Sequence, residues 1–124
     1  MKTEEVIKLI QRGKRVLWIF EKDSRLKKIR KLVKKLNINN KIYFATYKTL
    51  YFPMKSEKVK CPYCGKVSKY FWCHTCKNPI NRLYQNFPRN FFDVIVVDEC
   101  SFRPDLTPIL GHFKNAILTK AELN

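Results

Sequence analysis

Two short runs of uninterrupted apolar residues limit most strongly what this chain can fold into. They are VLWIF at Val16–Phe20 and VIVV at Val94–Val97. A strand that is apolar at every position is buried on both faces, which is typical of a parallel sheet covered by helices. Neither run approaches the roughly 20 residues that a membrane-spanning helix needs. We therefore predict buried strands of an α/β fold and no membrane span.

The segments between these runs complete an α/β pattern. Thr3 can cap a first helix that ends at Gly13, and a strand is predicted at Lys14–Phe20. Asp23 or Ser24 can cap a second helix, whose apolar spacing places Leu26, Ile29, Leu32, Val33 and Leu36 on one face. Further strands are predicted at Lys41–Thr46, Phe91–Val97 and 115–119. The first two strands and the helix between them form a βαβ unit.

These elements predict one domain over residues 1–124. Its expected fold class is α/β, a three-layer sandwich with a mainly parallel sheet. The pattern breaks from about Tyr51, and the cysteine block from Cys61 to Cys76 is interpreted as an insertion into the sheet domain. Residues 58–78, which include this block, are predicted to be a small zinc-ribbon β-hairpin.

Four of the five cysteines occur as two CxxC pairs separated by eight residues. The predicted metal ligands are Cys61, Cys64, Cys73 and Cys76. Four thiolates at this spacing suit tetrahedral zinc, and a closed shell of four cysteines indicates a structural role because no position remains for water. Gly65 permits a positive-φ turn after the first pair. His74 replacing Cys73 as a ligand, two disulfides and unliganded thiols remain as alternatives, and the role of Cys100 stays open.

The chain is strongly basic, with 26 Lys and Arg against 10 Asp and Glu and a formal net charge of +16. Such a charge attracts phosphate polyanions, although a lysine-rich solvated surface is the simpler explanation. The aromatic residues of the ribbon, which include Tyr63, Tyr70, Phe71 and Trp72, either stack on bases or pack the ribbon on its host domain. The predicted nucleic-acid contacts are Arg25, Lys27, Lys28, Arg30, Lys31, Lys34, Lys35, Thr46, Lys48, Lys66 and Lys69.

The beginning of the sequence does not resemble a signal peptide. In MKTEEVIKLIQRGKR, charged residues interrupt the apolar ones, whereas a signal peptide has a basic start followed by a continuous apolar stretch. Together with cysteines spaced for metal binding, this predicts a cytoplasmic protein in a reducing compartment.

Two acidic residues, Asp98 and Glu99, directly follow the second apolar run. Ligands of open α/β sheets bind at the carboxyl ends of strands. In a nucleotide hydrolase the Asp of such a pair holds magnesium and the Glu orients the attacking water. The simpler interpretation is that both residues cap the next helix or lie in solvent.

The order of these segments resembles the first RecA-like domain of superfamily-two helicases, the DExH and DEAD-box relatives, and the likeness covers most of the chain. RVLWIFEKDSRLKKI is similar to the strand and helix that carry the family's first strand-contacting motif. YFATYKTLY, with Ala45, Thr46, Tyr47 and Leu50, resembles the segment T-Y-x-x-L. FFDVIVVDECS matches the Walker B motif at Asp98 and Glu99, and NAILTKAEL is similar to the later S-A-T or T-A-T motif at Leu118, Thr119 and Ala121.

The departures from this family bear on activity. Its phosphate loop, G-x-x-x-x-G-K-S/T, precedes the first helix, whereas Gly13-Lys14-Arg15 follows that helix and lacks the second glycine and the Ser or Thr. Ser101 replaces the histidine or aspartate of the acidic box, and the sequence contains no second RecA-like domain with its arginine finger. The resemblance therefore implies a degenerate RecA-like remnant, and neither ATP nor magnesium is expected as a cofactor.

The leading functional hypothesis is a non-hydrolytic, zinc-containing protein that binds DNA or RNA largely through phosphates. It assigns no catalytic residue. One alternative is a helicase or ATPase subunit completed by a partner chain that supplies the phosphate loop. Another is an interaction module whose basic helix binds an acidic protein partner.

Overall fold

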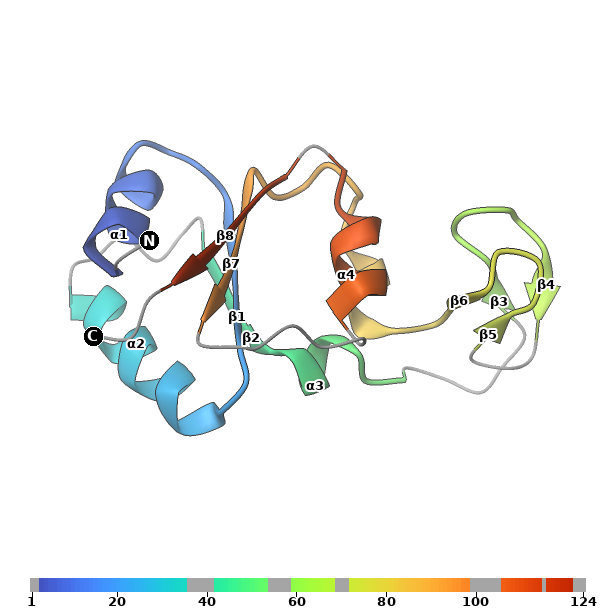
Figure 1. The fold of residues 1–124 in the computed structure, drawn as a ribbon, viewed down its shortest axis with the longest axis horizontal. Coiled ribbons are helices and arrows are strands. Elements are labelled where there is room, and N and C mark those ends of the chain that lie inside the picture. The colour runs from blue at the N-terminus through green and yellow to red at the C-terminus, as the bar shows by residue number, and fades with distance from the viewer. Residues whose placement is uncertain are drawn as a thin grey trace.

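The computed structural model describes residues 3–35, 42–53, 59–68, 72–98, 106–114 and 116–121 (Figure 1). In chain order the elements are α1 (Thr3–Gln11), β1 (Val16–Phe20), α2 (Asp23–Lys35), β2 (Ile42–Thr46), α3 (Tyr47–Leu50), β3 (Val59–Lys60), β4 (Val67–Ser68), β5 (Trp72–Cys73), β6 (Asn78–Pro79), the 3₁₀ helix η2 (Leu83–Asn86), β7 (Val94–Asp98), α4 (Leu106–His112) and β8 (Ile117–Ala121).

Four strands form a parallel sheet in the order β2-β1-β7-β8. Val16 at the start of β1 is level with Ile42 on one side and Val94 on the other. The chain moves outward in one direction from β1 to β2 and in the opposite direction from β7 to β8. The point where a parallel sheet reverses direction in this way is where α/β proteins commonly bind ligands, and here it lies between β1 and β7. The predicted mixed α/β fold with a parallel sheet is thus confirmed.

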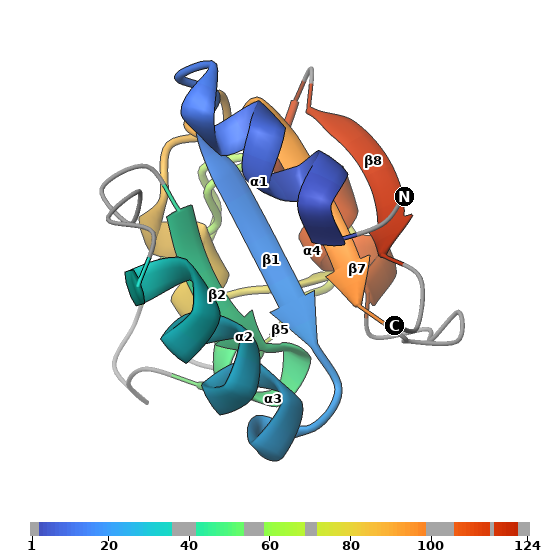
Figure 2. The same cartoon turned by 90° about the vertical axis from the view of Figure 1, so that its left-hand side faces the viewer.

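The sheet is buried on both faces because β1 is apolar at every position and β7 at every position before Asp98. On β1, Val16, Trp18 and Phe20 belong to one hydrophobic cluster, which includes residues of α1 and α2. Leu17 and Ile19 belong to the other, which includes residues of α3, η2 and α4. Figure 2 shows α1 and α2 in front of the sheet and α4 behind it.

Two expectations about apolar residues are wrong. Leu32 was expected on the apolar face of the second helix, yet 43% of it is exposed. The three buried residues Leu26, Ile29 and Val33 already fill the contact between α2 and the sheet, and Leu32 points to one side. The strand expected from Phe91 begins only at Val94. Leu36 lies outside the described residues.

Asp93, directly before β7, bonds to the residues at the starts of two neighbouring strands. Its backbone N–H donates to the Arg15 carbonyl at 2.8 Å, and its carboxylate accepts from the Arg15 N–H at 2.8 Å. The Asp93 carbonyl also accepts from the N–H of Ile117, at the start of β8, at 3.0 Å. One residue therefore aligns the starts of β1, β7 and β8.

Cys61, Cys64, Cys73 and Cys76 lie on two short antiparallel hairpins, β3–β4 and β5–β6, which occur in the chain between β2 and β7. Cys100 lies outside the described residues. Figure 1 places these cysteine hairpins at one end of the long axis of the molecule and α1 and α2 at the other. Across the ranges described, no helix combines the length and apolar character needed to cross a membrane.

Candidate metal centre and basic surface

The two hairpins bring the four predicted ligands together. Their sulfur atoms all lie within 4.8 Å of one another. The Cys61 and Cys76 sulfurs are 3.9 Å apart, and the Cys64 and Cys73 sulfurs are 3.6 Å apart. Tetrahedral zinc with Zn–S bonds of about 2.3 Å separates its sulfur ligands by about 3.8 Å. The cluster has the size and donor set of a zinc site, and none of the four cysteines forms a disulfide.

Each hairpin turns sharply after its second cysteine. Gly65, after Cys64, has a φ of 78°, as predicted, and its N–H donates to the Cys61 carbonyl at 2.9 Å. Lys77 occupies the same position after Cys76 and has a φ of 55°. Sequence reasoning missed this second turn because lysine, unlike glycine, gives no signal for a left-handed backbone.

The surroundings of the cysteines set their acidity unequally. A hydrogen bond from the Cys76 backbone lowers the pKa of the Cys73 thiol to about 7. Burial raises the pKa of Cys61, and side-chain hydrogen bonding to Cys64 raises the pKa of Cys76 to about 12. A metal ion binds thiolates, so it must displace protons from the more basic sulfurs.

Tyr63, inside the first CxxC pair, connects the cysteine cluster to α4. Its hydroxyl is 2.8 Å from Nδ1 of His112, and Nε2 of His112 is 2.9 Å from the Phe87 carbonyl. Nε2–H must donate to that carbonyl, and in the neutral ring the tyrosine hydroxyl then donates to the lone pair of Nδ1. The pKa of His112 is lowered, mainly because the side chain is buried. Sequence reasoning missed His112 because an isolated histidine in an apolar segment carries no distinctive signal.

Two further side chains hold the cysteine hairpins against the sheet domain. The Gln85 amide donates to the Pro79 carbonyl at 2.7 Å. The Arg89 guanidinium lies 5.0 Å from the centre of the Tyr63 ring and donates to the carbonyls of Gly111 and His112 at the end of α4. Tyr63 is therefore one of the ribbon aromatics that packs on the host domain. Trp72 is 42% exposed, whereas Tyr70 and Phe71 lie outside the described residues.

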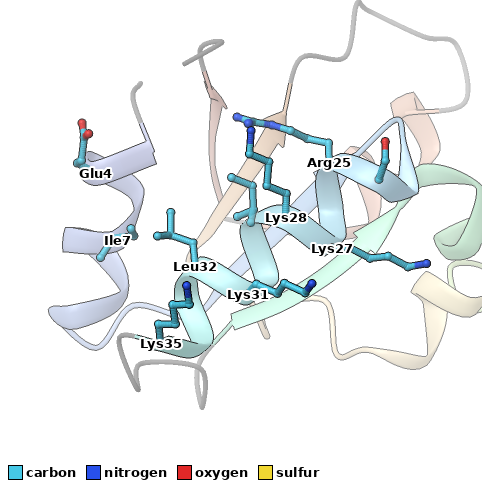
Figure 3. A pocket seen from close by; sticks show the side chains of 10 residues that line it. Glu4, Ile7, Arg25, Lys27, Lys28, Lys31, Leu32 and Lys35 are labelled. Atoms are coloured by element: carbon cyan, nitrogen blue, oxygen red, sulfur yellow. The ribbon is translucent and has the colours of Figure 1, made fainter.

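The second predicted site is the basic surface of α2. Asp23 is the only acidic residue of this helix, and it pairs with Lys27 at 3.1 Å. Six cationic side chains are exposed, and we call them the exposed α2 cations: Lys27, Lys28, Arg30, Lys31, Lys34 and Lys35. Several of them line a hollow of about 820 Å³ between α1 and α2, as Figure 3 shows, together with Ile7 and Leu32.

A second hollow, of about 390 Å³, lies on the other side of α2, towards β2. Arg30 and Lys34 contribute to it from the helix, and Tyr43 and Phe44 contribute from the strand. The Arg30 guanidinium lies 5.9 Å from the centre of the Phe44 ring. Cations and aromatic rings thus share this hollow.

Arg25 lines the same hollow as several of the exposed α2 cations but differs from them in its burial and its partner. Its side chain is only 15% exposed, and its Nε donates to Oδ2 of Asp98 at 3.0 Å. Asp98 is fully buried, and its Oδ1 has no hydrogen-bond partner among the described residues. The pair borders a hollow of about 130 Å³ at the carboxyl ends of β1 and β7, which Glu21 and Lys22 also line. Glu99 lies outside the described residues.

The other predicted nucleic-acid contacts are scattered. Thr46 precedes α3, and its hydroxyl accepts from the Thr49 N–H at 3.3 Å, so it caps that helix. Lys48 in α3 and Lys66 before β4 are exposed. Lys69 lies outside the described residues. Among the predicted contacts that the structure describes, only those of α2 form a dense group.

Comparison with known protein families, curated proteins and solved structures returned no match to this chain.

Proposed function

We propose that the chain is a non-hydrolytic nucleic-acid-binding protein with a structural zinc ion. Its contacts would be mostly to phosphates and independent of sequence. On this proposal the fold is a three-layer, degenerate RecA-like domain related to helicases, with residues 58–78 as an inserted zinc ribbon. Helices packed on both faces of the parallel sheet and hairpins that follow β2 in the chain support it.

The observation that carries the nucleic-acid proposal is the surface of α2. This helix of 13 residues carries six exposed cations and only one acidic side chain. A solvated helix gains stability when opposite charges alternate at i,i+4, but the cations of α2 repel one another. A polyanion relieves this repulsion and releases its own counterions, which favours binding to phosphates.

Zinc is proposed as the metal because the ligand set is four thiols in a cluster of tetrahedral size. Four cysteines would fill the shell of the ion, so it would hold the two hairpins together and take no part in a reaction. Cys61, Cys64, Cys73 and Cys76 would be its ligands.

One observation favours a second function, an ATPase subunit completed by a partner chain. The hollow between β1 and β7 lies where α/β proteins bind nucleotides, and it is lined by Asp98, whose Oδ1 has no hydrogen-bond partner among the described residues. Against this stands the ion pair, because the Arg25 guanidinium already provides Asp98 with a positive charge. We therefore rank this function second.

Fluorescence anisotropy with labelled single- and double-stranded DNA and RNA tests the first proposal. The titrations are repeated over a series of salt concentrations, with and without ATP and magnesium. We expect binding that weakens steeply with salt and does not respond to ATP. Magnesium-dependent nucleotide binding by the chain assembled with its partner, lost in Asp98→Ala, would favour the ATPase subunit. No binding of the chain to any nucleic acid would refute the first proposal.

A further inference from the structure

Exposed cations lie on both sides of α2. Lys28, Lys31 and Lys35 line the hollow towards α1, and we call them the α1-side cations. Arg30 and Lys34 line the hollow towards β2, and we call them the β2-side cations. A hollow therefore runs along each side of α2, and the exposed surface of the helix carries positive charge on both of these sides.

This arrangement follows from the spacing of the cations in the sequence. Neighbouring residues of an α-helix point in directions about 100° apart. The adjacent pairs Arg30–Lys31 and Lys34–Lys35 therefore diverge, one member towards each hollow. Leu26, Ile29 and Val33 anchor the opposite surface of the helix in the core.

The major groove of B-form DNA has matching dimensions. An α-helix with its side chains is about 10–12 Å across, and the groove is about 12 Å wide. A helix of 13 residues is about 20 Å long, enough to follow the groove past several phosphates. The phosphates of the two DNA strands lie along the two edges of the groove. The two sets of cations lie along the two sides of α2 in the same way.

We propose that α2 lies in the major groove of duplex DNA. The α1-side cations would contact the phosphates of one strand and the β2-side cations those of the other. This inference rests on the proposed function and narrows it to one class of nucleic acid. Duplex RNA would be excluded, because the major groove of an A-form helix is too deep and narrow to admit a protein helix.

Other ligands would use only one side of α2. A single strand, or an acidic amphipathic helix of a protein partner, would fit the larger hollow, where Ile7 and Leu32 provide apolar contact. Either ligand would leave Arg30 and Lys34 without a role. The presence of exposed cations on both sides therefore favours the duplex.

Two double variants with equal loss of charge test the proposal. They are Lys28→Gln/Lys35→Gln on the α1 side and Arg30→Gln/Lys34→Gln on the β2 side. The control, Lys14→Gln/Lys114→Gln, removes the same charge from exposed positions outside α2. Denaturant unfolding of each variant establishes that it folds, which is expected because all six positions are exposed.

Binding is measured with a mixed-sequence DNA duplex, its separated strands and an RNA duplex of the same sequence. We expect the DNA duplex to bind most tightly. The slope of log affinity against log salt is negative, and each α2 variant should make it less steep by about 2, whereas the control should leave it unchanged. The protein should also protect guanine N7, which faces the major groove, from methylation.

Binding that depends on the α1-side cations alone would overturn the proposal. So would separated strands or duplex RNA that bind as tightly as duplex DNA, or unprotected guanine N7 in the complex. In each of these cases nucleic-acid binding itself would stand. Absence of binding to every nucleic acid would refute both the inference and the function on which it rests.

Discussion

Two residues that directly follow a CxxC pair adopt the left-handed backbone conformation. They are Gly65 and Lys77, with φ values of 78° and 55°. The conformation is close to strain-free for glycine and costs other residues about 1 kcal/mol. The sequence predicted the first turn from its glycine and could not predict the second, which the hairpin imposes on a lysine.

A pair of glycine substitutions tests this reasoning. In Gly65→Ala the new methyl group would meet nothing within 4 Å, so the backbone strain alone should lower the free energy of unfolding by about 1 kcal/mol. Gly111 in α4 also has open space around it, and Gly111→Ala should raise that free energy by about 0.5 kcal/mol through helix propensity. Denaturant unfolding measures both. Equal effects of the two substitutions would contradict the argument.

His112 makes stability depend on pH. Burial holds its pKa below the value of 6.5 that applies in the unfolded chain. As the pH falls below 6.5, the unfolded chain therefore takes up a proton before the folded protein does. The free energy of unfolding should decrease from pH 6.5 down to the folded pKa of His112 and not decrease further on this account.

The measurement is denaturant unfolding over a pH series of the wild type and His112→Gln. Carboxylates and cysteines titrate in both proteins, so the difference between the two stabilities isolates the histidine. We expect this difference to shrink as the pH falls below 6.5. A difference that stays constant across this range would show that His112 does not contribute as described.

At the scale of elements, the positions of the strands in the sequence were easier to predict than the order of the strands in the sheet. The uninterrupted apolar runs predicted β1 and β7 because only burial on both faces accommodates such sequences. The lateral order of the strands was not predictable, since no residue pattern encodes which strand lies beside which. Leu32 fits helical spacing but lies beyond the narrow stripe of α2 that contacts the sheet.

The cysteine cluster was predicted in full, because ligand spacing within a CxxC pair is local. The contact of this centre with α4 was not, since Tyr63 and His112 are 49 positions apart in the sequence. The same limit applies to the ion pair between α2 and β7, which spans 73 positions. Long-range polar contacts depend on the assembled fold.

Tyr63→Phe should loosen the attachment of the cysteine hairpins to α4. The substitution leaves Nδ1 of His112 buried without its donor, which costs about 1–2 kcal/mol. Denaturant unfolding should show this loss while the metal content stays unchanged. Tyr43→Phe is the matched control, because Tyr43 is 37% exposed and its loss of a hydroxyl should change stability by less than about 0.5 kcal/mol.

At the scale of the whole molecule, the sheet and the cysteine hairpins have separate hydrophobic clusters. Cys61 and Cys73 pack with Ile80, apart from the two clusters that cover the sheet. We therefore expect removal of the proposed zinc to unfold the cysteine hairpins and leave most of the sheet intact.

Hydrogen exchange with and without a zinc chelator measures this difference. Chelation should release about one zinc per chain and speed exchange between residues 59 and 80, while β1 and β7 stay protected. Cys61→Ser should reproduce the effect. A full zinc content in Cys61→Ser, or a sheet that loses protection together with the hairpins, would contradict the two-part organisation.

The strand order also bears on how the chain reaches its fold. β1 lies beside β7, yet Val16 and its neighbour Val94 come from opposite ends of the sequence. The central pairing must wait for a long loop to close, which makes folding slow and leaves two apolar strands exposed to other chains meanwhile. A net charge of +16 repels those chains from one another. We therefore expect the basic composition to slow aggregation of newly made chains during the interval before β1 and β7 meet.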